Sequence, residues 1–168
     1  QTCALPISSF TRSLVNDEQA LVDVLVTSVM RVTHAALPGM IQRGRGGVIN
    51  VSSVAGWMTS GTYSAAKAWA TTFSESLSAG LRSTPVHVMA LCPGYVRTEF
   101  HSRADMKLES IPAWMWLDAD RLVARALHDF AAGRTISVPS LRYKVLGGLT
   151  RWLPRSVVRR ISMVSRSR

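Results

Sequence analysis

The sequence predicts an α/β fold in which helices flank a parallel β-sheet. Helical and strand-like apolar segments alternate along the chain, and the helical ones are long enough to connect parallel strands. Hydrophobic residues make up 47% of the 168 residues, which is enough for a packed α/β core. Ligands of such sheets gather at the carboxyl ends of the strands, so functional side chains are expected there.

Local patterns justify each predicted element. Valines at helical spacing predict a helix over 16–42. Asn16 is its predicted cap, and Gly44 follows its end. Pro38 is expected to kink or break it near its last turn. Apolar runs bounded by turn residues predict the strands. The further elements are a strand over 47–53, a helix over about 62–82, a strand over 86–92, a helix from Asp118 to about Ala132, and a short strand from Arg134 to Pro139.

Tyr63 and Lys67 are the strongest candidates for chemistry. They stand four residues apart in a predicted helix, so their side chains share one face. A lysine ammonium beside a phenol favours the phenolate and lowers the pKa of a tyrosine, which is about 10 in water. Such a tyrosine exchanges a proton with an alcohol near neutral pH. Ser53, at the end of the preceding strand, offers a hydroxyl to the oxygen that gains or loses this proton.

The order of these segments resembles the short-chain dehydrogenase/reductase family. The strand Val48-Ile-Asn-Val-Ser-Ser53 precedes Val54-Ala-Gly, a glycine-containing loop, and then Tyr63-Ser-Ala-Ala-Lys67. A second strand follows and runs into Pro93-Gly94-Tyr95-Val96-Arg97-Thr98. The likeness spans about residues 15–140 and is densest over 46–99.

The resemblance implies a Rossmann-like sheet and hydride transfer between NAD or NADP and the carbonyl or alcohol of a small, lipophilic substrate. It implies that Tyr63 is the general acid/base, that Lys67 lowers the tyrosine pKa and binds the nicotinamide ribose, and that Ser53 polarises the substrate carbonyl. Ser52 is the less favoured serine, because successive strand side chains point to opposite faces. The residues expected beside the cofactor are Tyr63, Lys67, Pro93, Gly94, Val96 and Thr98. The loop from Glu99 to about Trp116 is expected to cover the substrate.

Position 25 departs from the family pattern. The resemblance leads us to expect an asparagine there, which holds a water in the proton relay behind the lysine. The chain carries Leu25, which cannot hydrogen-bond. Either the relay runs differently or activity is reduced.

The N-terminal part of the chain also departs from the family pattern. No glycine-rich phosphate loop precedes residue 15, and Gly44-Arg-Gly46-Gly47 follows a helix, so we interpret it as a helix stop and turn. Residues 1–7 resemble the translation of a sequencing adapter and are expected to be an artefact. Residues 8–140 are then the catalytic portion of the domain, without its first β-α-β nucleotide-binding portion. We expect this chain alone to bind NAD(P) poorly and to be inactive.

Positive charge is concentrated in the last 28 residues. The net charge of +10 divides into +8 for residues 141–168 and +2 for the rest, and no acidic residue follows Asp129. Apolar residues are interleaved with these cations, which predicts a basic amphipathic helix suited to an anionic membrane surface. The alternative is a helix that covers the substrate site or a subunit contact. No apolar run reaches about 18 residues, so a membrane span is not expected.

Other features exclude several function classes. The four histidines share no metal-ligand spacing with other candidate ligands, so no metal site is expected, and no nucleic-acid-binding motif accompanies the basic tail. Two cysteines build no disulfide framework, which fits a reducing cytoplasm, and Cys92 is expected to be a buried structural thiol. His101 and the Trp114-Met-Trp116 patch fall in the expected substrate loop, where the patch either lines the substrate or packs on the sheet.

Two functions from different classes remain open at this stage. The favoured one is the oxidoreductase. The family resemblance implies that it forms a homo-oligomer through the helices over 16–42 and 62–82. The alternative is a non-catalytic pseudoenzyme or a membrane-surface interaction module that uses the basic tail. Leu25 and the missing glycine loop motivate this alternative.

Overall fold

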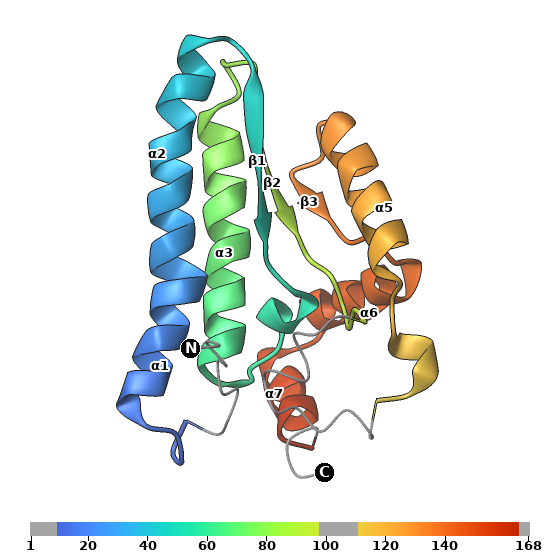
Figure 1. The fold of residues 1–168 in the computed structure, drawn as a ribbon. Coiled ribbons are helices and arrows are strands. Elements are labelled where there is room, and N and C mark those ends of the chain that lie inside the picture. Colours follow the sequence, from blue (N-terminus) through green and yellow to red (C-terminus); the bar gives the residue numbers. More distant parts are fainter. Residues whose placement is uncertain (1–9, 98–110, 165–168) are drawn as a thin grey trace.

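The computed structural model describes residues 10–97 and 111–164, and it confirms the predicted parallel α/β fold (Figure 1). Three strands form one sheet in the order β1-β2-β3: β1 is Gly46–Val51, β2 is Val86–Leu91 and β3 is Ile136–Ser137. Both pairings are parallel, with Gly46 opposite Val86 and Ala90 opposite Ile136. The carboxyl ends of the strands therefore lie at one edge of the sheet.

Helices cover both faces of this sheet. One layer contains α1 (Val15–Val22), the π-helical segment η1 (Asp23–Thr27), α2 (Ser28–Gln42) and α3 (Gly61–Gly80). In Figure 1 these helices run side by side on one side of the strands, and α5 (Ala119–Ala131) lies on the other. The 3-10 turns η2 (Val54–Trp57) and η4 (Ala113–Met115) and the helices α6 (Leu141–Trp152) and α7 (Arg155–Val164) lie toward the carboxyl ends of the strands.

The core is centred on β2. Val88, Met89, Ala90 and Cys92 are completely buried, because β2 pairs on both sides and is covered on both faces. One apolar cluster joins Ala90 and Cys92 to Val138 and Tyr143, and a second joins Leu91 to Leu122 and Ala126 of α5. The burial of Cys92 is as predicted from its place after an apolar strand.

Among the sequence predictions about helices, the Asn16 cap and the single tail helix were wrong. The first helix begins at Val15 with Leu14 as its N-cap, so Asn16 lies inside it; the amides of Asp17 and Glu18 both donate to the Leu14 carbonyl. Of the two outcomes predicted at Pro38, a break does not occur, because α2 continues through it to Gln42. Proline removes one donor, while packing of α2 against β1 remains. The tail forms two helices rather than one, because Pro154 interrupts it after Leu153.

The long first helix carries more apolar surface than expected. Val15–Gln42 is long and apolar enough to cross a membrane by length and composition, contrary to the expectation that no stretch qualifies. In the fold it lies along α3 as one of the layers beside the sheet. Only 17% of its apolar window is buried in the fold, and one such helix by itself is weak support for a membrane span.

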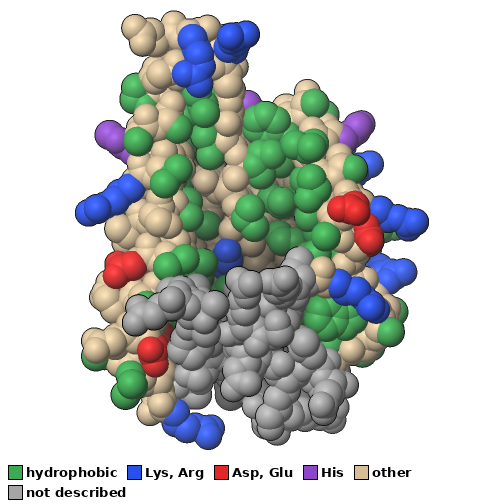
Figure 2. Space-filling view, in the orientation of Figure 1, with side chains coloured by type: hydrophobic (Ala, Val, Ile, Leu, Met, Phe, Trp, Pro, Cys, Tyr) green, Lys and Arg blue, Asp and Glu red, His purple; other side chains and the backbone are tan. Residues whose placement is uncertain are grey.

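Apolar side chains also remain exposed beside the sheet. Figure 2 shows hydrophobic side chains gathered between α2 and α5 on the viewed face. Val51 is exposed at the end of β1, which is an edge strand, and Val123 and Leu127 are exposed on α5. Exposed strand edges and apolar surfaces of this kind favour association.

Candidate active site

The candidate site lies where β1 and β2 end. The amide of Ser52 donates to the Leu91 carbonyl at 2.7 Å, and the amide of Val54 donates to the Pro93 carbonyl at 3.0 Å. These two bonds extend the ladder past both strands and hold the serine pair beside the Pro93-Gly94 turn. α3 begins at Gly61, whose φ of 70° is a left-handed conformation that glycine adopts without strain.

The two adjacent serines have different surroundings. The Ser52 hydroxyl is 2% exposed, donates to the Lys67 carbonyl at 2.6 Å, and lies 2.7 Å from the hydroxyl of Thr71. The Ser53 hydroxyl accepts a bond from the Ala55 amide at 3.1 Å and also hydrogen-bonds the side chain of Tyr63. Strand alternation thus directs Ser52 into α3 and Ser53 toward Tyr63.

Tyr63 and Lys67 lie on one face of α3, as their spacing predicts. The Lys67 ammonium is 5.7 Å from the centroid of the Tyr63 ring. The same Nζ donates to the carbonyl oxygen of Val51, the last residue of β1, at 2.8 Å. This bond fixes the lysine at the strand end, and it uses one of the three donors of the ammonium.

The pKa of Tyr63 differs from the expectation. Burial raises it above its usual value near 10, and the hydrogen bond with Ser53 only partly opposes this. Burial also lowers the pKa of Lys67 to about 8. Burial of the phenol dominates, and Lys67, whose ammonium bonds the Val51 carbonyl, does not lower the pKa of Tyr63 as expected. Tyr63 therefore keeps its proton at neutral pH in this chain.

A buried polar network supports the site from behind. The Asn50 amide donates to the Ser74 hydroxyl at 3.0 Å, and its carbonyl oxygen accepts from Thr33 at 3.3 Å. All three side chains are buried. The network joins α2, β1 and α3 three residues before Ser53. Sequence reasoning missed it, although a lone asparagine in an apolar strand was the available signal.

Two glycines let the turn η2 and the helix α6 pack closely beside the site. A Cβ on Gly56 would lie 2.8 Å from the amide nitrogen of Ala68, so only glycine lets η2 approach α3 this closely. A Cβ on Gly147 of α6 would overlap the ring of Trp57 in η2. α6 therefore packs directly on the turn that follows Ser53.

Tyr143 of α6 closes over the Pro93-Gly94 turn. Its ring fills the space that a Cβ on Gly94 would occupy. Its hydroxyl accepts from the Tyr95 amide at 3.2 Å and donates to the Met115 carbonyl at 2.8 Å. Pro93 lies beside Ser53 and Val54, Gly94 lies against Tyr143, and Val96 packs toward Leu117 and the α5 cluster. Sequence reasoning missed Tyr143.

Comparison with known proteins identifies the family. Residues 5–108, more than half of the chain, match the family model described as short chain dehydrogenase. The chain belongs to the short-chain dehydrogenase family. This membership confirms the resemblance drawn from Ser53, Tyr63 and Lys67, and with it the oxidoreductase class.

Individual relatives are similar to this chain over part of its length. The chain is 42% identical over 89 residues to sulfoacetaldehyde reductase of Chromohalobacter salexigens, which covers 51% of this chain and 35% of that protein. It is 37% identical over 101 residues to the NADP-dependent 3-hydroxy acid dehydrogenase YdfG of Escherichia coli, which covers 58% of this chain and 41% of that protein. The chain thus spans well under half the length of these curated relatives.

Solved structures agree on the fold. A short-chain dehydrogenase from Sphingobium yanoikuyae in complex with NADPH superposes with a TM-score of 0.74 at 26% identity, covering 86% of this chain and 58% of that chain. A 7beta-hydroxysteroid dehydrogenase superposes with a TM-score of 0.77 at 19% identity, covering 92% and 61%, and supports the fold alone.

Of the other residues to which the sequence analysis gave a role, the structure describes some and not others. Leu25 lies half-buried in the π-helical segment η1. Val96 bridges Leu117, which connects the Pro-Gly turn to the segment before α5. Thr98, His101 and most of the expected substrate loop lie outside the described residues. The rings of Trp116 and Tyr95 are tilted by 52° with their centroids 5.8 Å apart, whereas Trp114 is exposed.

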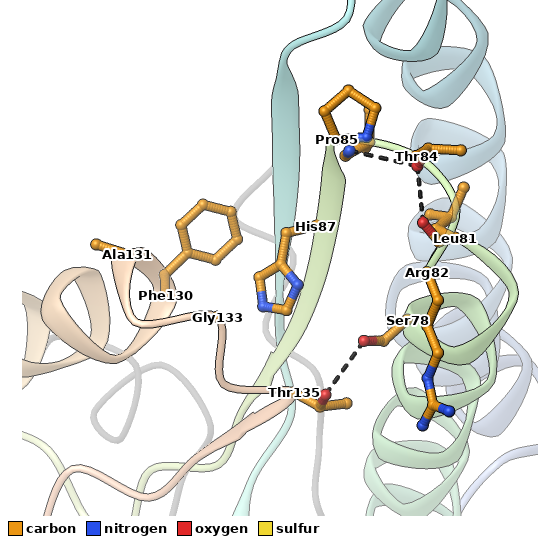
Figure 3. A pocket seen from close by; sticks show the side chains of 11 residues that line it. Ser78, Leu81, Arg82, Thr84, Pro85, His87, Phe130, Ala131, Gly133 and Thr135 are labelled. Carbon is orange, nitrogen blue, oxygen red and sulfur yellow. Dashed lines mark hydrogen bonds between the residues drawn. The ribbon is translucent and has the colours of Figure 1, made fainter.

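A cavity of about 440 Å³ lies away from this site (Figure 3). Its lining includes Val86 and His87 at the start of β2, together with Arg82, Phe130 and Thr135. It therefore opens at the amino end of the strand whose carboxyl end leads to Pro93, and it is not part of the candidate site. Among the described residues no group of three potential ligands could hold a metal ion.

Proposed function

We propose that the protein containing this chain transfers hydride between NAD or NADP and a carbonyl or alcohol group, with Tyr63 as the acid/base. The observation that carries the proposal is the meeting of Ser53, Tyr63 and Lys67 at the carboxyl ends of β1 and β2. The names of similar proteins agree with it, since one is NADP-dependent and one was solved with NADPH.

The donor set fits a nicotinamide nucleotide. Among the described residues Lys67 uses one ammonium donor on the Val51 carbonyl, which leaves two for the hydroxyl groups of a ribose. Pro93, Gly94, Val96 and Thr98 are the residues that we propose on the cofactor side, and Pro93 is held beside Ser53 by the bond between the Val54 amide and the Pro93 carbonyl. The bound cofactor would supply or accept the hydride.

The side chains would handle the proton and the orientation of the substrate. Ser53 would hydrogen-bond the substrate oxygen and hold it beside the Tyr63 hydroxyl. Because burial keeps Tyr63 protonated, it would donate its proton to that oxygen as a carbonyl is reduced. In the reverse direction the same oxygen of Tyr63 would accept the alcohol proton. Lys67 would stabilise the phenolate that remains after donation.

We also propose that residues 8–140 form the catalytic portion of the domain and that residues 141–168 form a basic C-terminal extension, which packs on that portion through Tyr143 and Gly147. On this basis the 168-residue chain binds NAD(P) weakly, because no glycine-rich loop is present for the pyrophosphate. Calorimetry with NADPH and NADH measures this directly. Tight binding of either nucleotide to the chain would contradict the division. Homo-oligomerisation through α2 and α3 is a further proposal for the longer protein.

An activity screen tests the function. The longest reading frame that carries this sequence is assayed with NADPH and NADH against aldehydes, ketones and 3-oxo acids, following cofactor absorbance. We expect oxidation of one cofactor with at least one carbonyl class. Absence of hydride transfer with every substrate, in a folded protein that binds the cofactor, would favour the non-catalytic alternative that Leu25 motivates.

A further inference from the structure

One face of α6 carries an exposed row of apolar side chains. Leu141, Val145, Leu149 and Trp152 recur at helical spacing and form what we call the α6 stripe. They are 77%, 56%, 55% and 90% exposed, respectively. A surface helix of a globular protein normally turns such a row toward the core.

The opposite face of α6 is already occupied. Tyr143 is buried over the Pro93-Gly94 turn, and Gly147 packs against the ring of Trp57. These contacts orient the helix so that the α6 stripe faces outward. The stripe therefore lacks a partner among the described residues.

Charge indicates what the α6 stripe contacts. Residues 141–168 contain eight basic residues and no acidic one, and exposed Arg142, Arg159 and Arg160 belong to this set. Two copies of the chain facing each other through this region would bring the same positive charges together. An anionic surface, in contrast, would attract them. A helix with an apolar row, nearby arginines and a terminal tryptophan suits the plane of a lipid interface.

α5 offers an internal comparison. Val123 and Leu127 are 51% and 55% exposed, close to the values of Val145 and Leu149. α5, however, is preceded by Asp118 and contains Asp120, so acidic side chains balance the basic ones near its apolar pair. The two helices thus present similar apolar pairs in different electrostatic surroundings.

We propose that α6 docks on anionic lipid surfaces, with the α6 stripe in the interface and exposed Arg142, Arg159 and Arg160 against the headgroups. The helix is 12 residues long, or about 18 Å, and lies in the plane of the interface. Because its other face contacts Trp57 and the Pro93-Gly94 turn, docking brings the candidate active site close to the lipid (Figure 1).

Vesicle co-sedimentation of the full 168-residue chain tests the proposal. Wild type is compared with Val145→Gln/Leu149→Gln on α6 and with the matched control Val123→Gln/Leu127→Gln on α5. The vesicles are phosphatidylcholine alone or an equimolar mixture with phosphatidylglycerol. Circular dichroism and thermal unfolding verify that all three proteins are folded, which is expected because every substituted side chain is more than half exposed.

The wild type and the α5 variant are expected to sediment with the anionic vesicles only, and added salt should release them. The α6 variant should bind at least about tenfold more weakly. The proposal is overturned if the wild type stays in solution with anionic vesicles at low salt, or if both variants bind alike. A wild-type dimer that the α6 variant loses, without vesicle binding, would make the stripe a self-association surface instead.

Tryptophan quenching gives a second measurement that does not depend on the double variants. Brominated phosphatidylcholine in the anionic vesicles quenches indoles that enter the interface. We expect quenching in the wild type and in Trp114→Phe, and loss of most of it in Trp152→Phe. The reverse pattern, with loss in Trp114→Phe, would place the substrate-side loop rather than α6 in the lipid and overturn the proposal.

Discussion

The ammonium of Lys67 donates a 2.8 Å hydrogen bond to the carbonyl oxygen of Val51 at the end of β1. This bond ties the centre of the candidate site to the sheet, and the Tyr63 ring lies 5.7 Å from the same ammonium. A buried cation and a buried phenol are thereby held together in one site. The predictions below follow from this arrangement and from the packing around it.

Lys67 should make stability depend on pH in a defined window. Its folded pKa of about 8 lies below its usual 10.5, so between these values the unfolded chain binds a proton that the folded chain has released. Stability due to this group therefore rises with pH across that window, by up to about 1.4 kcal/mol per pH unit. Denaturant unfolding of wild type and Lys67→Met at pH 7 to 10 measures the difference between them.

The control for this experiment is Arg31→Met, which removes an exposed cation from α2. The stability of wild type relative to Lys67→Met should improve as pH rises, whereas its stability relative to Arg31→Met should not. Comparing proteins cancels the opposite contributions of the tyrosines, whose pKa values burial raises. A constant difference between wild type and Lys67→Met would disprove the desolvation of Lys67.

Substitution of Ser52 should mainly affect stability, whereas substitution of Ser53 should mainly affect turnover. Ser52→Ala removes bonds to the Lys67 carbonyl and to Thr71, and should lower the free energy of unfolding by about 1–2 kcal/mol. Ser53→Ala should change stability less but reduce turnover of the longer protein by about 100-fold, the scale of losing one donor to a reacting oxygen. Equal effects of the two variants on turnover would contradict these separate roles.

The buried network around Asn50 should contribute to stability. Asn50→Ala leaves the hydroxyls of Thr33 and Ser74 without this partner and should cost about 2 kcal/mol in the free energy of unfolding. Asn16→Ala is the matched control, because Asn16 is exposed in α1, and it should change stability by less than about 0.5 kcal/mol. Similar losses in both variants would show that the network is not a stabilising feature.

Neighbouring glycines of α6 should respond in opposite ways to alanine. Gly147→Ala would place a methyl group in the ring of Trp57 and should destabilise the chain by about 1–3 kcal/mol. A Cβ on Gly148 meets nothing within 4 Å, so Gly148→Ala should stabilise α6 by about 0.5–1 kcal/mol through helix propensity. Thermal unfolding of both variants distinguishes them, and equal shifts would mean that α6 does not pack on Trp57.

Much of the fold and the grouping of the site could be predicted because they rest on local periodicity. Strand alternation places Ser53 on the side of Tyr63, and helical spacing places Lys67 on the same face as Tyr63. The pKa direction of Tyr63 could not be predicted, because it depends on how deeply the tertiary packing buries the phenol. The roles of Asn50 and Tyr143 also depend on partners far away in the sequence.

The most direct test of the central claim is the turnover of Tyr63→Phe in the longest reading frame that carries this sequence. Tyr95→Phe serves as a control at a neighbouring tyrosine without a proposed proton role. We predict that Tyr63→Phe binds the cofactor like wild type but loses at least about 1,000-fold in turnover, within the range of general acid–base catalysis and orientation combined. Tyr95→Phe should keep most of the activity. Retained turnover in Tyr63→Phe would contradict the assignment of Tyr63 as the acid/base.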